Sequence, residues 1–448
     1  MMARPRKNIA ASRASLLPES APLPEIPVQE QPYPLPEGWK WVRLGDCNHY
    51  AGETINPALF QEDIFELYSV PSCITGYPEI LSGKEIGSSK QSVELGDVLL
   101  CKINPRINRV WRVVGYTANR LAASSEWIVF RNKDISSKYM MLCMQSAYFR
   151  EYMLSNVSGV GGSLMRAQPK HVRRYPIPLP PREEQERIVG HIESLFARLD
   201  EARQKAEAVR DSVALRRAAI LHKAFTGELT AKWREEHNIR LSDWEEKSIA
   251  SLCHSLKYGT AKKSQKNGAV VVLRMGNLQS GEIDWSDLAY SDDEDDIQNY
   301  RLEKGDVLFN RTNSALLVGK TSIYRGEHPA IYAGYLIKMD YKKDILTGNY
   351  LNYIMNSQRA KEYCQKVKTD GVNQSNINAK KLGAFTIPLP PLSEQQEIVR
   401  ILDDLLGREQ RLREAADAVV AHIERMKKAI LARAFRGELG RADCPSRP

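Results

Sequence analysis

Three short stretches carry residues that could handle a phosphate or a metal ion. The sequence VGKT, which contains Gly319, ends like a phosphate-binding loop, but that motif needs a glycine where Ser314 stands, and TSIYR after it favours a strand over the required helix. The glycine-rich stretch SGVGGSLMRA has Leu164 in place of the last glycine of G-x-G-x-x-G and favours a flexible loop. Six adjacent residues in the acidic run SDDEDD cannot all point at one ion, so we expect a solvated loop there.

Histidine and cysteine spacing offers no metal or nucleophile pattern either. The 8 histidines lack H-E-x-x-H or another paired ligand spacing, and the 7 cysteines are odd in number, scattered and never spaced C-x-x-C. We therefore predict no catalytic residue, no metal site and no cofactor in this chain, which we expect to be a non-enzyme. Scattered cysteines, with no apolar run of roughly 18 residues and no apolar signal region, predict a cytoplasmic protein away from membranes. A net charge of +9 is compatible with a polyanionic partner.

A long internal repeat organises the chain of 448 residues. IPLPPREEQERIV begins at Ile177 and IPLPPLSEQQEIV at Ile387, and AAILHKAFTGELT at Ala218 matches KAILARAFRGELG at Lys428 with the same offset of 210. Prolines just before a first turn rich in acidic residues predict the start of a helix in each copy, and the glycine of A-F-x-G-E-L predicts its end.

Apolar residues recur in steps of three and four along both copies, which predicts two long helices paired as an antiparallel coiled coil. Arg216 breaks this stripe in the first copy and Glu409 breaks it in the second. The alternative, two amphipathic helices packed on separate domain cores, fits less well with so long and narrow a stripe. The predicted helix-pairing residues are Ile188, Ile192, Leu195, Leu199, Ile398, Leu402, Leu405 and Leu412.

Two unlike segments lie between the repeats and share landmarks in the same order. LGDVLLCK corresponds to KGDVLFNR, and YMMLCMQSAYFREYM to YLNYIMNSQRAKEYC. Short strands followed by one or two helices predict an α+β domain in each. The predicted organisation is a disordered tail (1–36), a first domain (37–176), a first helical spacer (177–230), a second domain (231–386), a second helical spacer (387–440) and a C-terminal tail (441–448).

Two divergent α+β domains alternating with helices that open I-P-L-P-P-x-x-E-Q and close A-F-x-G-E-L resemble the specificity subunit of type I restriction-modification systems. The resemblance covers nearly the whole chain after the tail. It implies two target recognition domains, each reading one half of a split sequence in double-stranded DNA, separated by antiparallel helices with pseudo-two-fold symmetry. It also implies two copies of a methyltransferase subunit that uses S-adenosylmethionine, and restriction subunits that use ATP and Mg²⁺.

Polar loops in both domains carry the side chains that read bases or hold phosphates. The stretches that directly follow G-D-V-L are the best candidates, because they occupy equivalent places in the two domains. The predicted DNA-binding residues are Lys102, Asn104, Arg106, Asn108, Arg109, Arg166, Gln168 and Lys170 in the first domain, and Lys257, Tyr258, Lys262, Lys263, Asn310, Arg311, Thr312, Asn313, Asn373, Gln374, Asn376 and Lys380 in the second.

Two rival functions follow from the same features. A self-contained methyltransferase or nuclease would need catalytic residues that no motif supplies. A coiled-coil interaction adaptor would need the helices but would leave the polar loops without a role in sequence recognition.

Overall fold

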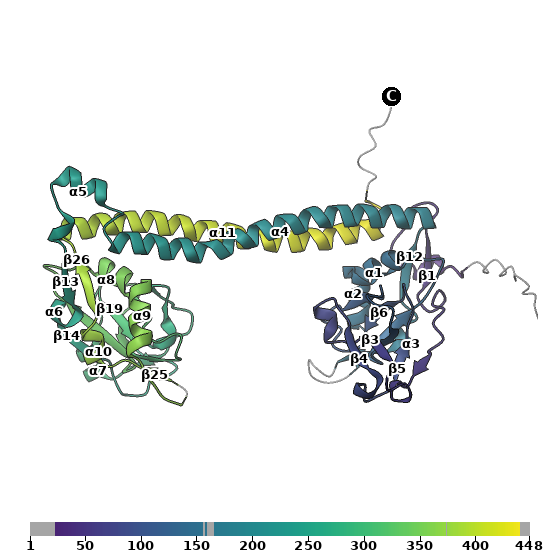
Figure 1. The fold of residues 1–448 in the computed structure, drawn as a ribbon, viewed down its shortest axis with the longest axis horizontal. Helices are drawn as coiled ribbons and strands as arrows, with labels where there is room; N and C mark the ends of the chain where they lie inside the picture. Colours follow the sequence, from purple (N-terminus) through teal and green to yellow (C-terminus); the bar gives the residue numbers. More distant parts are fainter. Residues whose placement is uncertain (1–22, 156, 159–164, 373, 440–448) are drawn as a thin grey trace, which may run out of the picture. The chain divides into compact units, whose positions relative to one another are not determined.

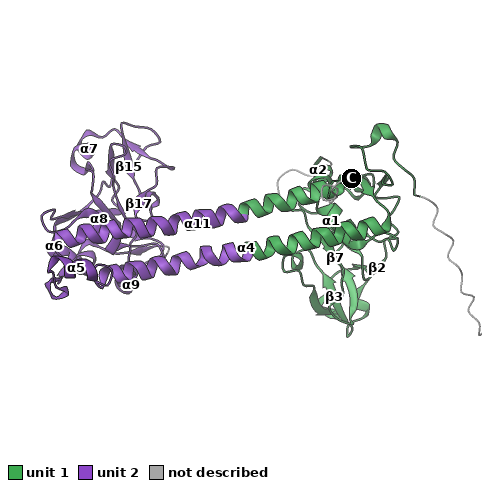
Figure 2. Cartoon of the chain, turned by 90° about the horizontal axis from the view of Figure 1, so that it is seen from above, with its two compact units in different colours: residues 1–203, 421–448 green, residues 204–420 purple. Residues whose placement is uncertain are grey.

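The computed structural model describes residues 23–155, 157–158, 165–372 and 374–439. The chain divides into two compact units, residues 1–203 with 421–448 (unit 1) and residues 204–420 (unit 2) (Figure 2). Each unit contains one α+β domain and parts of both long helices (Figure 1). The predicted fold class is confirmed.

Domain 1 is built from small sheets with helices at its C-terminal end. Its sheets have the strand orders β2-β5-β8-β3-β4, β7-β6-β9, β1-β12 and β10-β11. The elements of this domain are η1 (Val28–Glu30), β1 (Lys40–Arg43), β2 (Thr54–Ile55), η2 (Pro57–Leu59), β3 (Ile64–Tyr68), η3 (Ser72–Ile74), β4 (Glu79–Ser82), η4 (Gly83–Glu85), β5 (Lys90–Ser92), β6 (Val98–Cys101), β7 (Val110–Arg112), β8 (Arg120–Ala123), β9 (Trp127–Phe130), α1 (Ser137–Gln145), α2 (Ala147–Ser155), β10 (Val157–Ser158), β11 (Arg166–Ala167), α3 (Pro169–Val172) and β12 (Pro176–Leu179).

Domain 2 follows the same general plan with different sheets. Their strand orders are β14-β23-β19-β21, β18-β15-β22, β20-β25-β24, β16-β17 and β13-β26. The elements are α5 (Ala231–His237), η5 (Leu241–Asp243), β13 (Glu245–Ser248), α6 (Ile249–Leu252), β14 (Cys253–Tyr258), β15 (Val270–Leu273), η6 (Met275–Asn277), β16 (Leu278–Gln279), β17 (Glu282–Ile283), β18 (Tyr290–Ser291), α7 (Glu294–Tyr300), β19 (Val307–Asn310), β20 (Thr312–Asn313), β21 (Thr321–Ile323), β22 (Ala330–Tyr332), β23 (Leu336–Tyr341), α8 (Gly348–Met355), α9 (Gln358–Val367), β24 (Thr369–Asp370), β25 (Ser375–Asn376), α10 (Ala379–Gly383) and β26 (Thr386–Leu389).

The I-P-L part of each repeated motif is a strand. β12 pairs antiparallel with β1, and β26 pairs antiparallel with β13, in two separate two-stranded sheets. Proline is tolerated there because a strand with only one neighbour can leave its other edge without a backbone donor. Each domain therefore ends on the strand that leads directly into a long helix.

The long helices are α4 (Arg182–Phe225) and α11 (Leu392–Phe435), of 44 residues each. At 1.5 Å per residue, each is about 66 Å long. Within unit 1, Arg203 pairs with Glu424 and Asp200 with Lys427, so one residue number rises along the helix as its partner's falls. The helices are antiparallel, as predicted.

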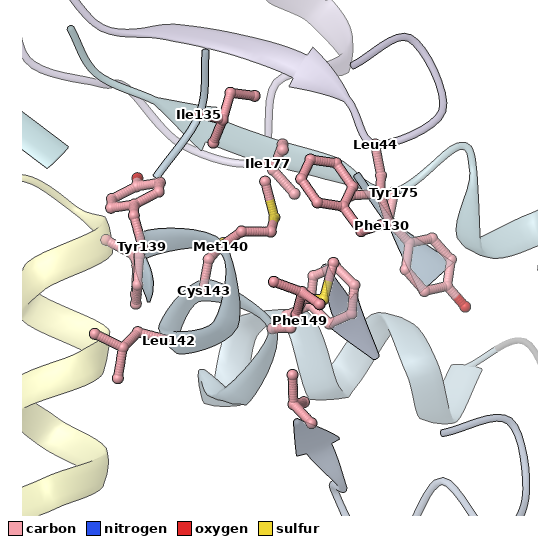
Figure 3. Close-up of a cluster of buried hydrophobic side chains, with 14 of the residues drawn as sticks. Leu44, Phe130, Ile135, Tyr139, Met140, Leu142, Cys143, Phe149, Tyr175 and Ile177 are labelled. Carbon is pink, nitrogen blue, oxygen red and sulfur yellow. The ribbon is translucent and has the colours of Figure 1, made fainter. Parts of the chain in front are cut away.

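The ends of both helices belong to the domain cores. Ile188 and Ile192 are buried in the core of domain 1, together with Phe435 from the end of α11. Figure 3 shows Tyr139 and Leu142 of this core facing the yellow helix, α11. In unit 2, Ile398 and Leu402 lie in the equivalent core. The alternative of helices packed on domain cores is therefore correct for the helix ends.

The remaining predicted pairing residues are less deeply buried. Leu195 packs against the core of domain 1, and Leu199 and Leu405 are half-buried. Leu412 is 42% exposed. Other apolar residues in the middle of the two helices, Val213, Ala416 and Ile423, are buried.

The two residues that interrupt the apolar stripe are partners. The Arg216 Nε–H donates to both carboxylate oxygens of Glu409, at 3.0 and 2.9 Å. A single ion pair therefore explains both interruptions. A half-buried charged pair at one level of a helical seam disfavours shifted registers, in which each charge would face an apolar residue.

The predicted disordered tail is wrong for residues 23–36. The Ile26 N–H donates to the Trp41 carbonyl at 2.9 Å, and the Tyr33 hydroxyl donates to the Phe435 carbonyl at 3.0 Å. The Tyr33 and Trp41 rings also meet edge to face at 4.9 Å. This segment includes η1 and is held by tertiary contacts, so it has no periodic pattern. Residues 1–22 and the C-terminal tail 441–448 lie outside the described residues.

The acidic run is also not a loop. Asp293 caps the N-terminus of α7, and Asp296 is buried and accepts a hydrogen bond from the Thr260 hydroxyl. Across the described ranges, no cluster of three metal-binding side chains occurs. No helix in the described part of the chain is both long and apolar enough to cross a membrane.

Candidate nucleic-acid interface

The G-D-V-L landmark forms the same turn in both domains. Gly96 and Gly305 have φ values of 90° and 96°, in the left-handed region where a side chain is strained. The following carboxylates, Asp97 and Asp306, accept the backbone N–H groups of Glu94 and Glu303. This turn starts β6 and β19, and the predicted DNA-binding stretches come directly after these strands.

In domain 1 the structure brings the two predicted polar stretches together. Ile103 forms a β-bridge with Arg166, the Asn104 N–H donates to the Met165 carbonyl at 2.9 Å, and the Ala167 N–H donates to the Lys102 carbonyl at 2.9 Å. We call this paired backbone, Lys102–Asn104 beside Met165–Ala167, corner 1. The glycine-rich stretch that precedes Met165 lies mostly outside the described residues.

Side chains at corner 1 differ in how free they are to meet a ligand. Asn104 has a φ of 45°, and within the described residues its buried Oδ1 has no hydrogen-bond partner. Arg166 is 57% exposed and forms an ion pair with Glu126 at 3.2 Å. Gln168 and Lys170, which follow Arg166 in the sequence, are exposed, and Lys102 is half-buried.

The rest of the first stretch turns back into the domain. The Asn108 amide donates to the Met144 carbonyl at 3.2 Å, and the Arg109 guanidinium donates to the Cys101 sulfur at 3.6 Å. Burial raises the pKa of the Cys101 thiol, so this sulfur accepts as a neutral group. Arg106 is exposed. Asn108 and Arg109 therefore support the loop.

Domain 2 repeats this backbone pairing with other side chains. Thr312 pairs with Asn376 across β20 and β25, and the Ile377 N–H donates to the Arg311 carbonyl at 2.9 Å. We call the paired backbone, Arg311–Asn313 beside Ser375–Ile377, corner 2. Because Thr312 faces Asn376 as Ile103 faces Arg166, Asn313 occupies the place that Asn104 has in corner 1.

A network of side chains joins three predicted stretches at corner 2. Arg311 donates to the Gly334 carbonyl at 3.2 Å and to the Asn376 Oδ1 at 3.3 Å, and its guanidinium carbon lies 4.9 Å from the centre of the Tyr258 ring. The Tyr258 hydroxyl accepts the Ala379 N–H at 2.9 Å. The Asn376 amide in turn donates to the Thr312 hydroxyl at 2.8 Å. Arg311 therefore organises this surface as well as contributing charge to it.

Two predicted residues lie apart from this network. Asn310 is fully buried, where its amide donates to the Met275 carbonyl at 3.3 Å and its Oδ1 accepts the Thr312 N–H, so it cannot contact DNA directly. Its prediction as a DNA-binding residue is wrong, because the strand is one residue longer than its apolar part. Lys257 lies beside Tyr300, donating to the Asn299 carbonyl at 2.7 Å.

A groove of about 700 Å³ lies against corner 2 and contains Arg311 in its wall. Lys262 and Lys263 line it too, and Lys262 forms an ion pair with Asp293 at 2.6 Å. Arg274 and Tyr335, which the sequence did not indicate, also line it. Arg274 directly follows β15 as Arg311 directly follows β19, so this position after a strand could have indicated Arg274 from the sequence. The groove combines cationic donors with an aromatic ring that is 49% exposed.

Gln374 and Lys380 are exposed beside corner 2, while Asn313 is half-buried. Asn373 lies outside the described residues. Each corner thus presents a backbone edge surrounded by amides and cations, which are the groups that contact base edges and phosphates.

Known proteins are similar to this chain in sequence. The family model for the type I restriction modification DNA specificity domain matches residues 241–416. The EcoKI specificity subunit of Escherichia coli K12 is 27% identical over 315 residues, covering 68% of this chain and 66% of its own length. The StySPI specificity subunit of Salmonella potsdam is 26% identical over 311 residues, with the same shares. The chain thus spans about two thirds of the length of these two relatives.

Solved structures support the same fold. A chain from a study of complex assembly and conformational transition of the type I R-M system has a TM-score of 0.76 at 22% identity, covering 91% of this chain and 100% of that one. The HsdS subunit of Thermoanaerobacter tengcongensis has a TM-score of 0.60 at 22% identity, covering 92% and 100%.

In sequence and fold the chain is similar to one class of protein, the specificity subunits of type I restriction enzymes. The resemblance indicated by the two repeated motifs is confirmed.

Proposed function

We propose that this chain is the DNA-recognition subunit of a type I restriction-modification complex, with each domain reading one half of a split sequence. The observation that carries the proposal is the shared construction of the corners. In both domains, the stretch after G-D-V-L pairs with a second polar stretch more than 60 residues later, and both are rich in side chains that read bases.

The chain acts as a scaffold without catalytic residues of its own. The antiparallel helices dock two methyltransferase subunits, and restriction subunits join this assembly. S-adenosylmethionine binds to the methyltransferase subunits, while ATP and Mg²⁺ bind to the restriction subunits. The complex works in the cytoplasm. The pseudo-two-fold repeat supports two copies of one partner, because it offers two equivalent helical surfaces.

The test is a binding titration with the purified chain and its methyltransferase subunit, on duplexes recovered from a random library and on scrambled duplexes. We expect recovered duplexes to share two short half-sites separated by a gap, and to bind at least 10³-fold more tightly than scrambled ones. Affinity that is indifferent to sequence would support the adaptor instead. Methyl transfer by the chain alone with S-adenosylmethionine would establish an enzyme.

A further inference from the structure

The two repeated motifs meet at one place in each domain. I-P-L-P-P-x-x-E-Q lies at the start of the helix that follows the domain, and A-F-x-G-E-L lies at the end of the other helix. The Phe435 ring of α11 packs 5.3 Å from the Tyr139 ring of domain 1, and the Phe225 ring of α4 packs 5.5 Å from the Tyr350 ring of domain 2. We call these meeting places joint 1 and joint 2.

A tyrosine ties the domain to the strand that leads into the helix at each joint. The Tyr139 hydroxyl donates to the Pro178 carbonyl at 2.7 Å, and the Tyr350 hydroxyl donates to the Pro388 carbonyl at 2.8 Å. Both tyrosines are fully buried. These bonds hold the strand but do not reach the helix itself.

The motif glutamine makes the link to the helix. In joint 1 the Gln185 Oε1 accepts the N–H of Ser136, the N-cap residue of α1, at 2.8 Å, and its amide donates to the Pro180 carbonyl at 2.9 Å. Gln185 is 3% exposed. Because Gln185 lies in the first turn of α4, one side chain connects the domain, Pro180 and the long helix.

Joint 2 repeats this arrangement. The Gln395 Oε1 accepts the N–H of Thr347, the N-cap residue of α8, at 2.9 Å, and its amide donates to the carbonyls of Pro390 at 2.9 Å and Ile345 at 2.8 Å. Gln395 is fully buried. An amide is needed here because the site presents one donor and one or two acceptors, and carboxylate oxygens cannot donate.

We propose that Gln185 and Gln395 are positioning residues that hold each domain at a set angle to its helix and so limit the gap between half-sites that the protein accepts. This inference rests on the proposed function. When a joint bends, the domain rotates relative to its helix. Even a small rotation displaces the corner of that domain along the DNA. Both glutamines are buried and act through the domain.

The test compares Gln395→Met with Gln396→Met in the full complex with the methyltransferase subunit. Methionine keeps the length and apolar stem of glutamine but makes none of its hydrogen bonds. Gln396 is the exposed neighbour on the same turn, so it is a matched control. The substrates are duplexes with both half-sites at the natural gap and at gaps one or two base pairs shorter or longer.

For Gln395→Met we expect methylation at altered gaps, relative to the natural gap, to rise about tenfold, with unchanged base preference in both half-sites. Gln396→Met should match the unmodified protein. Gln185→Met should reproduce the effect from joint 1. Amide exchange at Thr347 should also quicken while exchange in β19 and β23 stays the same.

Unchanged gap selectivity in a folded Gln395→Met complex overturns the inference. A Gln395→Met variant in which domain 2 unfolds also overturns it, because Gln395 would then support the fold. A variant with altered base preference in a half-site overturns it too, because Gln395 would then support the corner. Failure of the proposed function looks different, since the unmodified complex itself would then methylate without reference to two half-sites.

Discussion

Joint 1 and joint 2 use the same residue types at equivalent positions, whereas corner 1 and corner 2 share only their backbone pairing. Gln185 and Gln395 make matching hydrogen bonds, 210 residues apart. At the corners, Ile103 and Arg166 face each other where Thr312 and Asn376 do. A joint has to meet the same helices in both copies, while a corner is free to differ if the two domains read different bases.

Exchange of one domain should change DNA recognition most strongly. Residues 245–386 are replaced by the equivalent segment of a relative, which leaves Thr230, Arg234 and Trp244 in place to bind Glu394. We expect one half of the methylated sequence to change completely while the other half and the gap stay the same. Methylome sequencing measures all three, and altered bases in both halves would contradict independent domains.

Shortening the helices should do the opposite, changing the gap and keeping the bases. Deleting residues 203–209 together with 413–419 removes one heptad from each helix, about 10 Å, and preserves the pairing phase. We expect the gap to shorten by roughly two to four base pairs. The readout is the methylated sequence of an assembled, active complex. An active variant with the natural gap would show that the helices do not set the spacing.

The glutamate that precedes the motif glutamine is present in both copies but has different surroundings in each. Glu394 is fully buried and accepts hydrogen bonds from Thr230, Arg234 and Trp244, whereas its counterpart Glu184 is 29% exposed and bonds Arg187. We expect Glu394→Ala to destabilise domain 2 by about 3 to 5 kcal/mol, because it leaves a buried arginine without its carboxylate.

Glu184→Ala should cost about 1 kcal/mol or less, since its ion pair with Arg187 is partly exposed. Denaturant unfolding of both variants measures the difference. Equal losses would mean that the two copies depend on this carboxylate in the same way.

A single change at corner 2 tests DNA recognition and not stability. Arg311→Ala removes the bonds to Gly334 and Asn376 and opens the groove wall, so we expect a loss of about 1 to 3 kcal/mol in binding, confined to one half-site. Titrations on duplexes mutated in either half measure this. Equal weakening on every sequence would identify Arg311 as a phosphate contact.

The repeated and strongly patterned parts of the chain could be predicted from the sequence. The two long helices, the strands β6, β9, β15, β19 and β23, and the pairing of two α+β domains with two helices follow from apolar periodicity and from motifs that occur twice. The candidate stretches after G-D-V-L were predicted because they occupy equivalent places in the two domains. At the second of them the structure brings Tyr258, Arg311 and Asn376 together.

Tertiary contacts account for what the sequence did not reveal. Asn310 continues a buried strand and uses its polar atoms internally, which residue type alone cannot indicate. Gln185 follows three charged or polar residues in a motif that also fits simple helix capping, and only the fold places Ser136 beside it. Residues 23–36 lack periodicity because their order depends on Trp41 and the end of α11.

The most direct test of this account is single-molecule methylome sequencing of cells that carry the complete system, compared with cells in which this chain alone is deleted. We predict adenine methylation in a split sequence, with two unlike half-sites and a constant gap, that disappears entirely on deletion. Methylation that persists without the chain, or that depends on the chain but occurs in one continuous sequence, would contradict it.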